Sequence, residues 1–397
     1  MTLCMQARDS MHLPPRVHHA EAARVRFGSR FEILVGALAR SDSAADRAID
    51  SLQDRSDANA LIHRAIAGEV DGQLPEALVE LVAAATEVPA WLDRSRIARA
   101  CQLFYRAGPL GGLVLALRSL VGGYTAPVGN KPLAFSGRLR EQAPRRLAET
   151  SRFVTAVASK GGLLPGGEGL AITLRVRLMH ARVRRLLLAD KRWDHESWGL
   201  PINQHDMLAT ILLFSAVFID GLKLMGVPVS ETEADDYLHL WRYVGVVIGV
   251  EPSLLPTSFA AARRDVDLIQ LTSGEPDDDS RALTQALFEI PASLTPLERG
   301  LASARVTLMQ ALCRRLLGDP VADRLGIEAT PLDRILPLTS PMIRGSHLLR
   351  RLSPRLDDLA LRLSAAYWDY SASAGLGGDP ATYPLPEGLR SRPHMHG

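Results

Sequence analysis

Helical periodicity is the feature of this sequence that most constrains its fold. Apolar residues recur every three to four positions from about Glu21 to Ser373. Strands need runs that alternate between apolar and polar residues, and such runs are nearly absent. The pattern therefore predicts an all-α fold, with a single domain over 21–373. Residues 1–20 form an N-terminal extension in this interpretation, and 374–397 form an extended C-terminal tail rich in glycine and proline.

The composition supports a large core and weighs against one class of partner. Of the 397 residues, 47% are hydrophobic and 23% are charged, which is an ordinary globular mixture. The formal net charge is only +2 and aromatic residues make up 5%. Nucleic-acid binding calls for a basic excess with interleaved aromatics, so no nucleic-acid partner is expected.

Cysteines and apolar segments indicate the compartment. The three cysteines lack CxxC spacing, so neither a disulfide framework nor a zinc site is predicted. The N-terminus has no apolar signal-like segment, and the longest apolar stretch, Met207–Ile219, is shorter than the roughly 20 residues that a spanning helix needs. We expect a cytoplasmic protein without a transmembrane segment. The oligomeric state is unknown at this stage.

Two segments rich in glycine and proline interrupt the helical pattern. Val121–Gly137 is expected to be a long irregular loop, and such loops are more often functional than idle. Gly161–Gly169 (GGLLPGGEG) lacks the lysine and hydroxyl residue of a phosphate-binding loop, so it is predicted to connect two helices.

The helix expected over Leu170–Leu188 places one histidine, His180, on its apolar stripe. The apolar residues at −8, −4, +3 and +7 from it are Ile172, Val176, Val183 and Leu187. The imidazole should therefore point inward. A hydrogen-bonded core histidine is one interpretation, and an iron ligand is the other, because a five-coordinate haem requires a neutral imidazole beside an apolar pocket.

Charged residues lie near this histidine and on the preceding helix. Arg177 and Arg184, at −3 and +4 from His180, flank the stripe and would suit an anionic group such as a haem propionate. Upstream, one helix face carries Arg146, Glu149, Thr150 and Phe153 at offsets 0, +3, +4 and +7. That face is either part of a polar site or an ordinary surface pair of arginine and glutamate.

Alternative sites have weaker support. Asp236 and His239 form a D-x-x-H motif, but a di-iron bundle needs such a motif from two helices, and only one stands out. A G-x-S-x-G elbow of hydrolases is missing from the sequence.

The order of four motifs resembles the latex-clearing protein (rubber oxygenase) and MpaB-type oxygenase family. The motifs are RLAET at Arg146–Thr150, RVRLMHARVR at Arg175–Arg184, PINQHDMLATILLFS at Pro201–Ser215 and YLHLWRYVGVVIGV at Tyr237–Val250. The resemblance spans about 104–256.

This resemblance implies a globin-reminiscent helical core that holds one haem b through a single histidine and cleaves isoprenoid double bonds with dioxygen. His180 would then be the proximal iron ligand, and Arg146 and Thr150 would be distal residues. Glu149 stands where latex-clearing proteins have a lysine, and the segment near Asn130 offers no counterpart of their distal glutamate, which weighs against rubber itself as the substrate.

We therefore expect a haem b-dependent oxygenase that uses dioxygen to oxidise or cleave a hydrophobic, unsaturated small molecule. The catalytic candidates are Arg146, Glu149 and Thr150, and the cofactor-binding candidates are His180, Arg177 and Arg184. Two alternatives stay open: a haem protein that senses a gas or acts as a peroxidase, and a helical interaction protein without haem.

Overall fold

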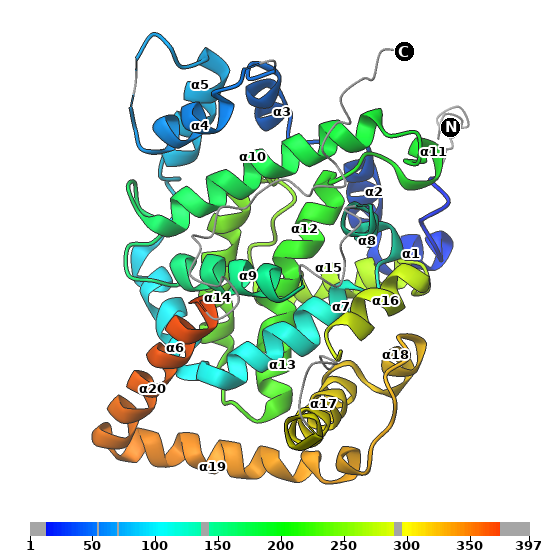
Figure 1. Cartoon of the computed structure of the whole chain (residues 1–397), viewed down its shortest axis with the longest axis vertical. Coiled ribbons are helices and arrows are strands. Elements are labelled where there is room, and N and C mark those ends of the chain that lie inside the picture. Colours follow the sequence, from blue (N-terminus) through cyan, green and yellow to red (C-terminus); the bar gives the residue numbers. More distant parts are fainter. Residues whose placement is uncertain (1–12, 54, 70, 136–142, 290–295, 374–397) are drawn as a thin grey trace, which may run out of the picture.

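The computed structural model describes residues 13–53, 55–69, 71–135, 143–289 and 296–373, without the side chains of 143–144, 146 and 296–299. Within these ranges every regular element is a helix, which confirms the predicted all-α fold (Figure 1).

The elements of the first half are α1 (Ala20–Phe27), α2 (Ser29–Gly36), η1 (Ala37–Ala39), α3 (Ser43–Asp50), α4 (Ala58–Ile66), α5 (Glu76–Thr86), α6 (Arg94–Val114), η2 (Leu115–Leu120), α7 (Val121–Gly123), α8 (Pro127–Ala134), α9 (Ala143–Val157) and α10 (Glu168–Ala189). Those of the second half are α11 (His195–Trp198), α12 (Gln204–Leu212), η3 (Leu213–Val217), α13 (Phe218–Met225), α14 (Glu231–Val247), α15 (Phe259–Thr272), α16 (Asp278–Ala286), α17 (Pro296–Leu317), α18 (Asp319–Arg324), η4 (Pro331–Arg334), η5 (Leu336–Leu338), α19 (Thr339–Leu352) and α20 (Pro354–Ser373).

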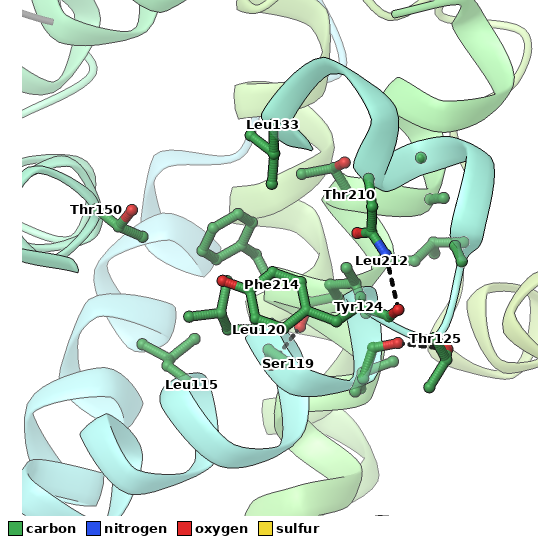
Figure 2. Close-up of a pocket in the computed structure, with 18 of the residues that line it drawn as sticks. Leu115, Ser119, Leu120, Tyr124, Thr125, Leu133, Thr150, Thr210, Leu212 and Phe214 are labelled. Atoms are coloured by element: carbon green, nitrogen blue, oxygen red, sulfur yellow. Dashed lines mark hydrogen bonds between the residues drawn. The ribbon is translucent and has the colours of Figure 1, made fainter. Parts of the chain in front are cut away.

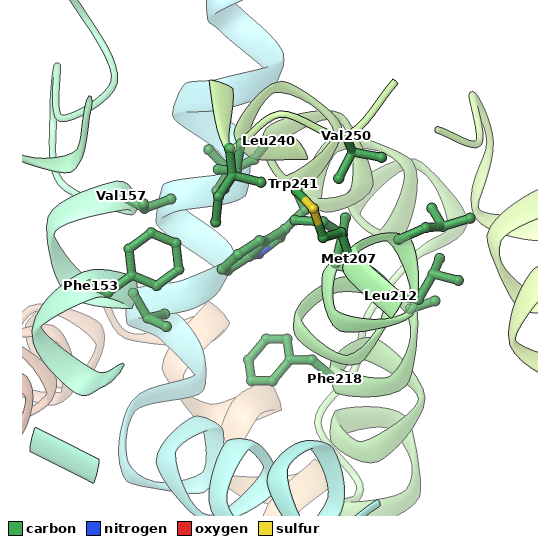
Figure 3. Packing of buried hydrophobic residues seen from close by; sticks show 14 of the residues in the cluster. Phe153, Val157, Met207, Leu212, Phe218, Leu240, Trp241 and Val250 are labelled. Carbon is green, nitrogen blue, oxygen red and sulfur yellow. The ribbon is translucent and has the colours of Figure 1, made fainter. Parts of the chain in front are cut away.

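An aromatic cluster forms the centre of the core, where α9, α14 and the α12–α13 run meet (Figure 3). The indole of Trp241 on α14 stacks on the ring of Phe214, with centroids 4.7 Å apart. Phe153 on α9 packs edge-on against the same indole at 6.0 Å. Aromatic rings bury large apolar areas, so this cluster fixes the relative positions of three elements that also border the site described below.

Two helical runs are wound partly as π-helices. Leu115–Leu120 (η2) continues α6, and Leu213–Val217 (η3) joins α12 to α13. The two segments contact each other, and the hydroxyl of Ser119 donates a hydrogen bond to the Leu213 carbonyl at 2.7 Å. Short π-helical segments occur often at functional sites, and these two lie against each other in the core.

The apolar run Met207–Ile219 is part of a longer continuous helix. The continuous helix Gln204–Met225 has 22 residues, and Arg94–Gly123 has 30, so both are long and apolar enough to span a membrane by length and composition. However, 61% of the apolar window in Gln204–Met225 is buried inside the protein. Such burial is typical of a core helix.

The prediction of an irregular loop over Val121–Gly137 is wrong for most of that segment. It contains α7 and α8, and α8 begins at Pro127, where the missing N–H of proline costs nothing in the first helical turn. Two side chains fix α8 to the start of α16: the Asn130 amide donates to the Ser280 hydroxyl at 3.2 Å, and Lys131 pairs with Asp277 at 2.7 Å.

The glycine-rich segment Gly161–Gly169 connects α9 to α10, as predicted. Its glycines have no Cβ atom, so their backbone can pack directly against the carbonyl groups of neighbouring residues. A Cβ atom on Gly169 would lie 2.7 Å from the Ala156 carbonyl oxygen and 2.9 Å from that of Gly162. Backbone atoms cannot move aside as the end of a flexible side chain can, so a larger residue at this position would not fit. The tight turn therefore fixes α10 relative to α9.

His239 joins α14 to the start of α6. Its Nε2 accepts a hydrogen bond from the Asp93 backbone N–H at 3.0 Å, and only 6% of the residue is exposed. Burial, together with the positive charges of Arg96 and Arg242, lowers the pKa of His239 from 6.5 to about 4. The native ring is therefore neutral at pH 7, and protonation would remove the lone pair that accepts this bond.

We expect this histidine to make stability depend on pH. Between pH 6.5 and 4 the unfolded chain binds the proton and the folded chain does not. The free energy of unfolding should therefore fall as the pH falls through this window, by up to about 1.4 kcal/mol per pH unit for one such histidine. Urea denaturation at a series of pH values measures the slope. His239→Gln, which stays neutral and still offers an acceptor, should show a shallower slope, and an unchanged slope would contradict the assignment.

Candidate active site

One large cavity of about 1350 Å³ lies between the π-helical segments and the helices around them (Figure 2). Its wall is mainly apolar and is formed by η2, α8, α9, α10, η3, α15 and α20. Figure 2 shows Thr150 on one side of this space, with Tyr124, Phe214 and Leu133 opposite. The cavity exceeds the roughly 300–1,000 Å³ of an ordinary ligand pocket, so it can hold a large apolar ligand.

His180 on α10 lies in the cavity wall, as its place on the apolar stripe suggested. The stripe itself is buried: Ile172, Val183 and Leu187 are nearly inaccessible to solvent. His180 keeps some accessible surface because it borders the cavity, whereas its Nδ1 is buried with no hydrogen-bond partner among the described residues.

The electrostatic environment keeps His180 neutral. Burial, together with the nearby positive charge of Arg184, lowers the pKa of its imidazole from 6.5 to about 4. A neutral imidazole has a free lone pair on one ring nitrogen and can ligate a metal at pH 7. The interpretation as a hydrogen-bonded core histidine finds no supporting bond in the described part of the chain.

Arg177 and Arg184 do not line the cavity. The Arg177 guanidinium forms two hydrogen bonds with the Asp42 carboxylate, at 2.6 and 2.9 Å, and a third with the Val247 carbonyl. Arg184 is 1% exposed and binds Asp46 at 2.7 Å and the Ile202 carbonyl at 2.7 Å. Both side chains thus join α10 to α3, and we assign them to packing rather than to a cofactor.

Of the three catalytic candidates predicted on α9, two line the cavity. Thr150 and Glu149 both line the cavity, and the Glu149 carboxylate accepts a hydrogen bond from Arg145 Nε at 3.1 Å. The side chain of Arg146 lies outside the described residues. Thus α9 brings a hydroxyl and a carboxylate to the cavity that also contains His180.

Several cavity residues escaped the sequence interpretation. They are Ser119, Tyr124, Asn130, Thr210 and Phe214. Asn130 is buried, and its amide donates to the Tyr124 carbonyl at 2.7 Å, so it holds the backbone between α7 and α8 in place. The long-loop argument pointed to this segment but could not select residues within it.

The remaining metal-site candidate has a structural role. Asp236 is buried between the guanidinium groups of Arg96 and Arg99, at 2.8 and 2.6 Å, and His239 binds Asp93 as described above. Across the described ranges no three residues of His, Cys, Asp or Glu converge to hold a metal ion. A single imidazole beside a large apolar space suits a metal that arrives within a flat organic cofactor better than a bare ion.

An all-α fold around a large, mainly apolar cavity with a neutral histidine in its wall is typical of a helical protein that binds hydrophobic molecules. The chain belongs to the family described as ER-bound oxygenase mpaB/B'/Rubber oxygenase, catalytic domain, whose model matches residues 102–348. It is accordingly an oxidoreductase of the oxygenase type. The match begins near Phe104, as the motifs indicate, and continues well past Pro256.

Two relatives show the extent of the similarity. The Rubber oxygenase of Streptomyces sp. (strain K30) is 26% identical over 310 residues, which are 76% of this chain and 74% of that protein. A solved structure of Latex Clearing Protein LCP in the closed state has 24% sequence identity and a TM-score of 0.63, and the alignment covers 84% of this chain and 91% of the other. The structural likeness supports the fold.

Proposed function

We propose that this chain is a haem b-dependent oxygenase that uses dioxygen to oxidise or cleave a hydrophobic, unsaturated small molecule. The observation that carries the proposal is the neutral imidazole of His180 in the wall of the 1350 Å³ cavity, with its Nδ1 free of any described hydrogen bond. In the proposal His180 is the protein's ligand to the haem iron.

The residues of the cavity fit this cofactor. A ligand for haem iron must be neutral at working pH, and the low pKa of His180 meets that condition. The apolar wall and large volume leave room for a flat macrocycle and a substrate together. When bound, the haem would supply the activation of dioxygen, which no amino-acid side chain provides.

The chain's own residues would bind and orient the substrate. Phe214 and the leucines of η2 offer an apolar surface to a hydrocarbon chain, and the Thr150 hydroxyl can donate a hydrogen bond to an oxygen atom in the cavity. Glu149 can accept or return a proton at its carboxylate. Arg146 remains a predicted distal donor that rests on the resemblance alone.

Cavity size favours this proposal over the alternatives. A haem protein that senses diatomic gases needs space for the macrocycle and only two further atoms, whereas Thr150 and His180 border a cavity of about 1350 Å³. A haem-free interaction protein would have His180 packed against side chains without a slot beside it. The observed cavity wall argues against both.

Oxygen uptake tests the proposal directly. Protein expressed with a haem precursor is assayed for haem b as its pyridine complex, then supplied with squalene, an unsaturated isoprenoid, or with squalane, its saturated counterpart. We expect a Soret band, oxygen consumption with squalene only, and carbonyl products from the broken double bonds. A colourless protein after haem titration would overturn the cofactor assignment. A haem-loaded protein that consumes no oxygen with unsaturated isoprenoids or lipids would overturn the oxygenase proposal.

A further inference from the structure

The hairpin formed by α19 and α20 carries an exposed apolar face. In the described part of the chain, eighteen large apolar side chains are exposed, and ten of them lie between 335 and 370. These ten, which we call the hairpin face, are Ile335, Leu338, Met342, Leu348, Leu349, Leu352, Leu356, Leu359, Leu363 and Tyr370. Soluble proteins scatter such residues singly, so a concentration within 36 positions marks an interaction surface.

The spacing on α20 gathers these residues on one side. Leu356, Leu359, Leu363 and Tyr370 stand at 0, +3, +7 and +14, which brings them to the same side of a helix.

The opposite side of α20 is already packed against the protein. Trp368 is buried, and the Ser364 hydroxyl lies 3.3 Å from where a Cβ atom on Gly108 of α6 would be. The helix is thus apolar on two sides, and only one of them packs against another part of the described chain.

Positive charge accompanies the exposed leucines. From Thr339 to Arg355 the sequence contains four arginines and no acidic residue. Arg350 pairs with Asp357 at 2.9 Å, whereas Arg344, Arg351 and Arg355 are exposed without an ion pair to any described residue. These three unpaired arginines lie within 12 positions of the sequence and place positive charge beside the exposed leucines.

We propose that the hairpin face docks on the surface of a membrane that contains anionic lipids. Leucines and a tyrosine on one face, with arginines beside them, are the features of a helix that lies in the interface of a bilayer. The apolar side chains would enter the boundary between headgroups and acyl chains, and the arginines would meet the negative surface potential. A second copy of this chain would instead bring its own arginines to the same face, where like charges repel.

The face is continuous with the cavity. Tyr370 belongs to the hairpin face, with 70% of its surface exposed, and also lines the cavity, as do Tyr367 and Ser371 on the same helix. Figure 1 shows α19 along the lower edge of the molecule and α20 rising from it. A bilayer against the exposed side of α20 would present its apolar phase beside Tyr370 at the cavity rim. Entry of a lipid-soluble substrate by this route rests on the proposed function, whereas docking itself rests on the face and its charges.

Sedimentation with lipid vesicles tests docking without substrate or turnover. Full-length protein is mixed with vesicles of phosphatidylcholine alone or with phosphatidylglycerol added, at low and high salt. We expect binding to the anionic vesicles that weakens with salt. The triple variant Leu352→Ser/Leu359→Ser/Leu363→Ser should bind at least about tenfold more weakly, as should Arg344→Glu/Arg351→Glu/Arg355→Glu.

A control is Val25→Ser, which alters an even more exposed apolar residue outside the hairpin face. It should bind like the wild type, and circular dichroism should show the same helicity in all variants. Failure of the wild type to bind any vesicle, or equal binding by the triple serine variant, would overturn the proposal. Light scattering that shows a dimer abolished by the serine substitutions would assign the face to a second copy instead. Loss of haem or of oxygen uptake leaves these readouts unaffected.

Discussion

His180→Ala should yield a folded protein that no longer holds its cofactor. The substitution removes the one described imidazole in the cavity wall, and with it the nitrogen that we propose as the iron ligand. We expect the Soret band of the purified protein to be lost, haem affinity to fall by more than about a hundredfold, and oxygen uptake to disappear. Absorption spectra with haem titration measure the first two effects, and an oxygen electrode measures the third.

A second buried histidine provides the control for this result. His347 on α19 is 5% exposed and its pKa is lowered to about 4 by burial, but it does not line the cavity. His347→Ala should therefore keep the Soret band. Added imidazole should restore part of the haem binding to His180→Ala, because it can occupy the space that the side chain leaves. Wild-type spectra from His180→Ala would show that another group ligates the iron.

Arg177→Met should destabilise the protein by about 3–5 kcal/mol, even before any cofactor is added. The Arg177 and Asp42 side chains are 11% and 5% exposed, so the substitution leaves a buried carboxylate without its counter-charge. Chemical denaturation of the haem-free protein, followed by circular dichroism, measures the loss. If Arg177 held a haem propionate instead, the same substitution would weaken haem binding and leave the haem-free protein unchanged.

The same pair of helices offers a matched comparison. Arg185 and Asp50 also join α10 to α3, at 3.1 Å, but they are 36% and 65% exposed. Water screens such a pair, so Arg185→Met should cost less than about 1 kcal/mol. Adding Asp42→Asn to Arg177→Met should recover part of the lost stability, since it removes the buried charge.

Local patterns in the sequence predicted much of this architecture. The apolar stripe on α10 correctly placed His180 facing inward, because a helix buries the side that carries its apolar residues. Ser230 and Glu233, which have the S-x-x-E spacing of a capping box, form one at the start of α14. By contrast, glycines and prolines suggested a loop where α8 forms, since Pro127 marks the start of that helix and not a break.

Partners far apart in sequence explain what the patterns missed. Arg177 and Arg184 lie on either side of His180, yet their carboxylates come from residues 135 and 138 positions away. Periodicity within one helix cannot reveal such pairs. For the same reason Tyr124 and Thr210 could not be assigned to the cavity, because they reach the same cavity as His180 only once several helices have packed.

The π-helical segments on the cavity wall have a consequence for how such a chain can change in length. A π-helix places more residues in each turn than an α-helix, so deletion of one residue from Leu115–Leu120 or Leu213–Val217 could restore the α-helical winding. Because the wider π-helical turn holds about one residue more than an α-helical turn, the side chains beyond such a deletion would keep their direction, whereas a deletion from an α-helical stretch would rotate them by about 100° around the helix axis. Tyr124 follows the first segment and Phe214 lies in the second. The two π-helical segments are therefore the points of this wall at which the chain can lose one residue and still present the side chains that follow to the cavity.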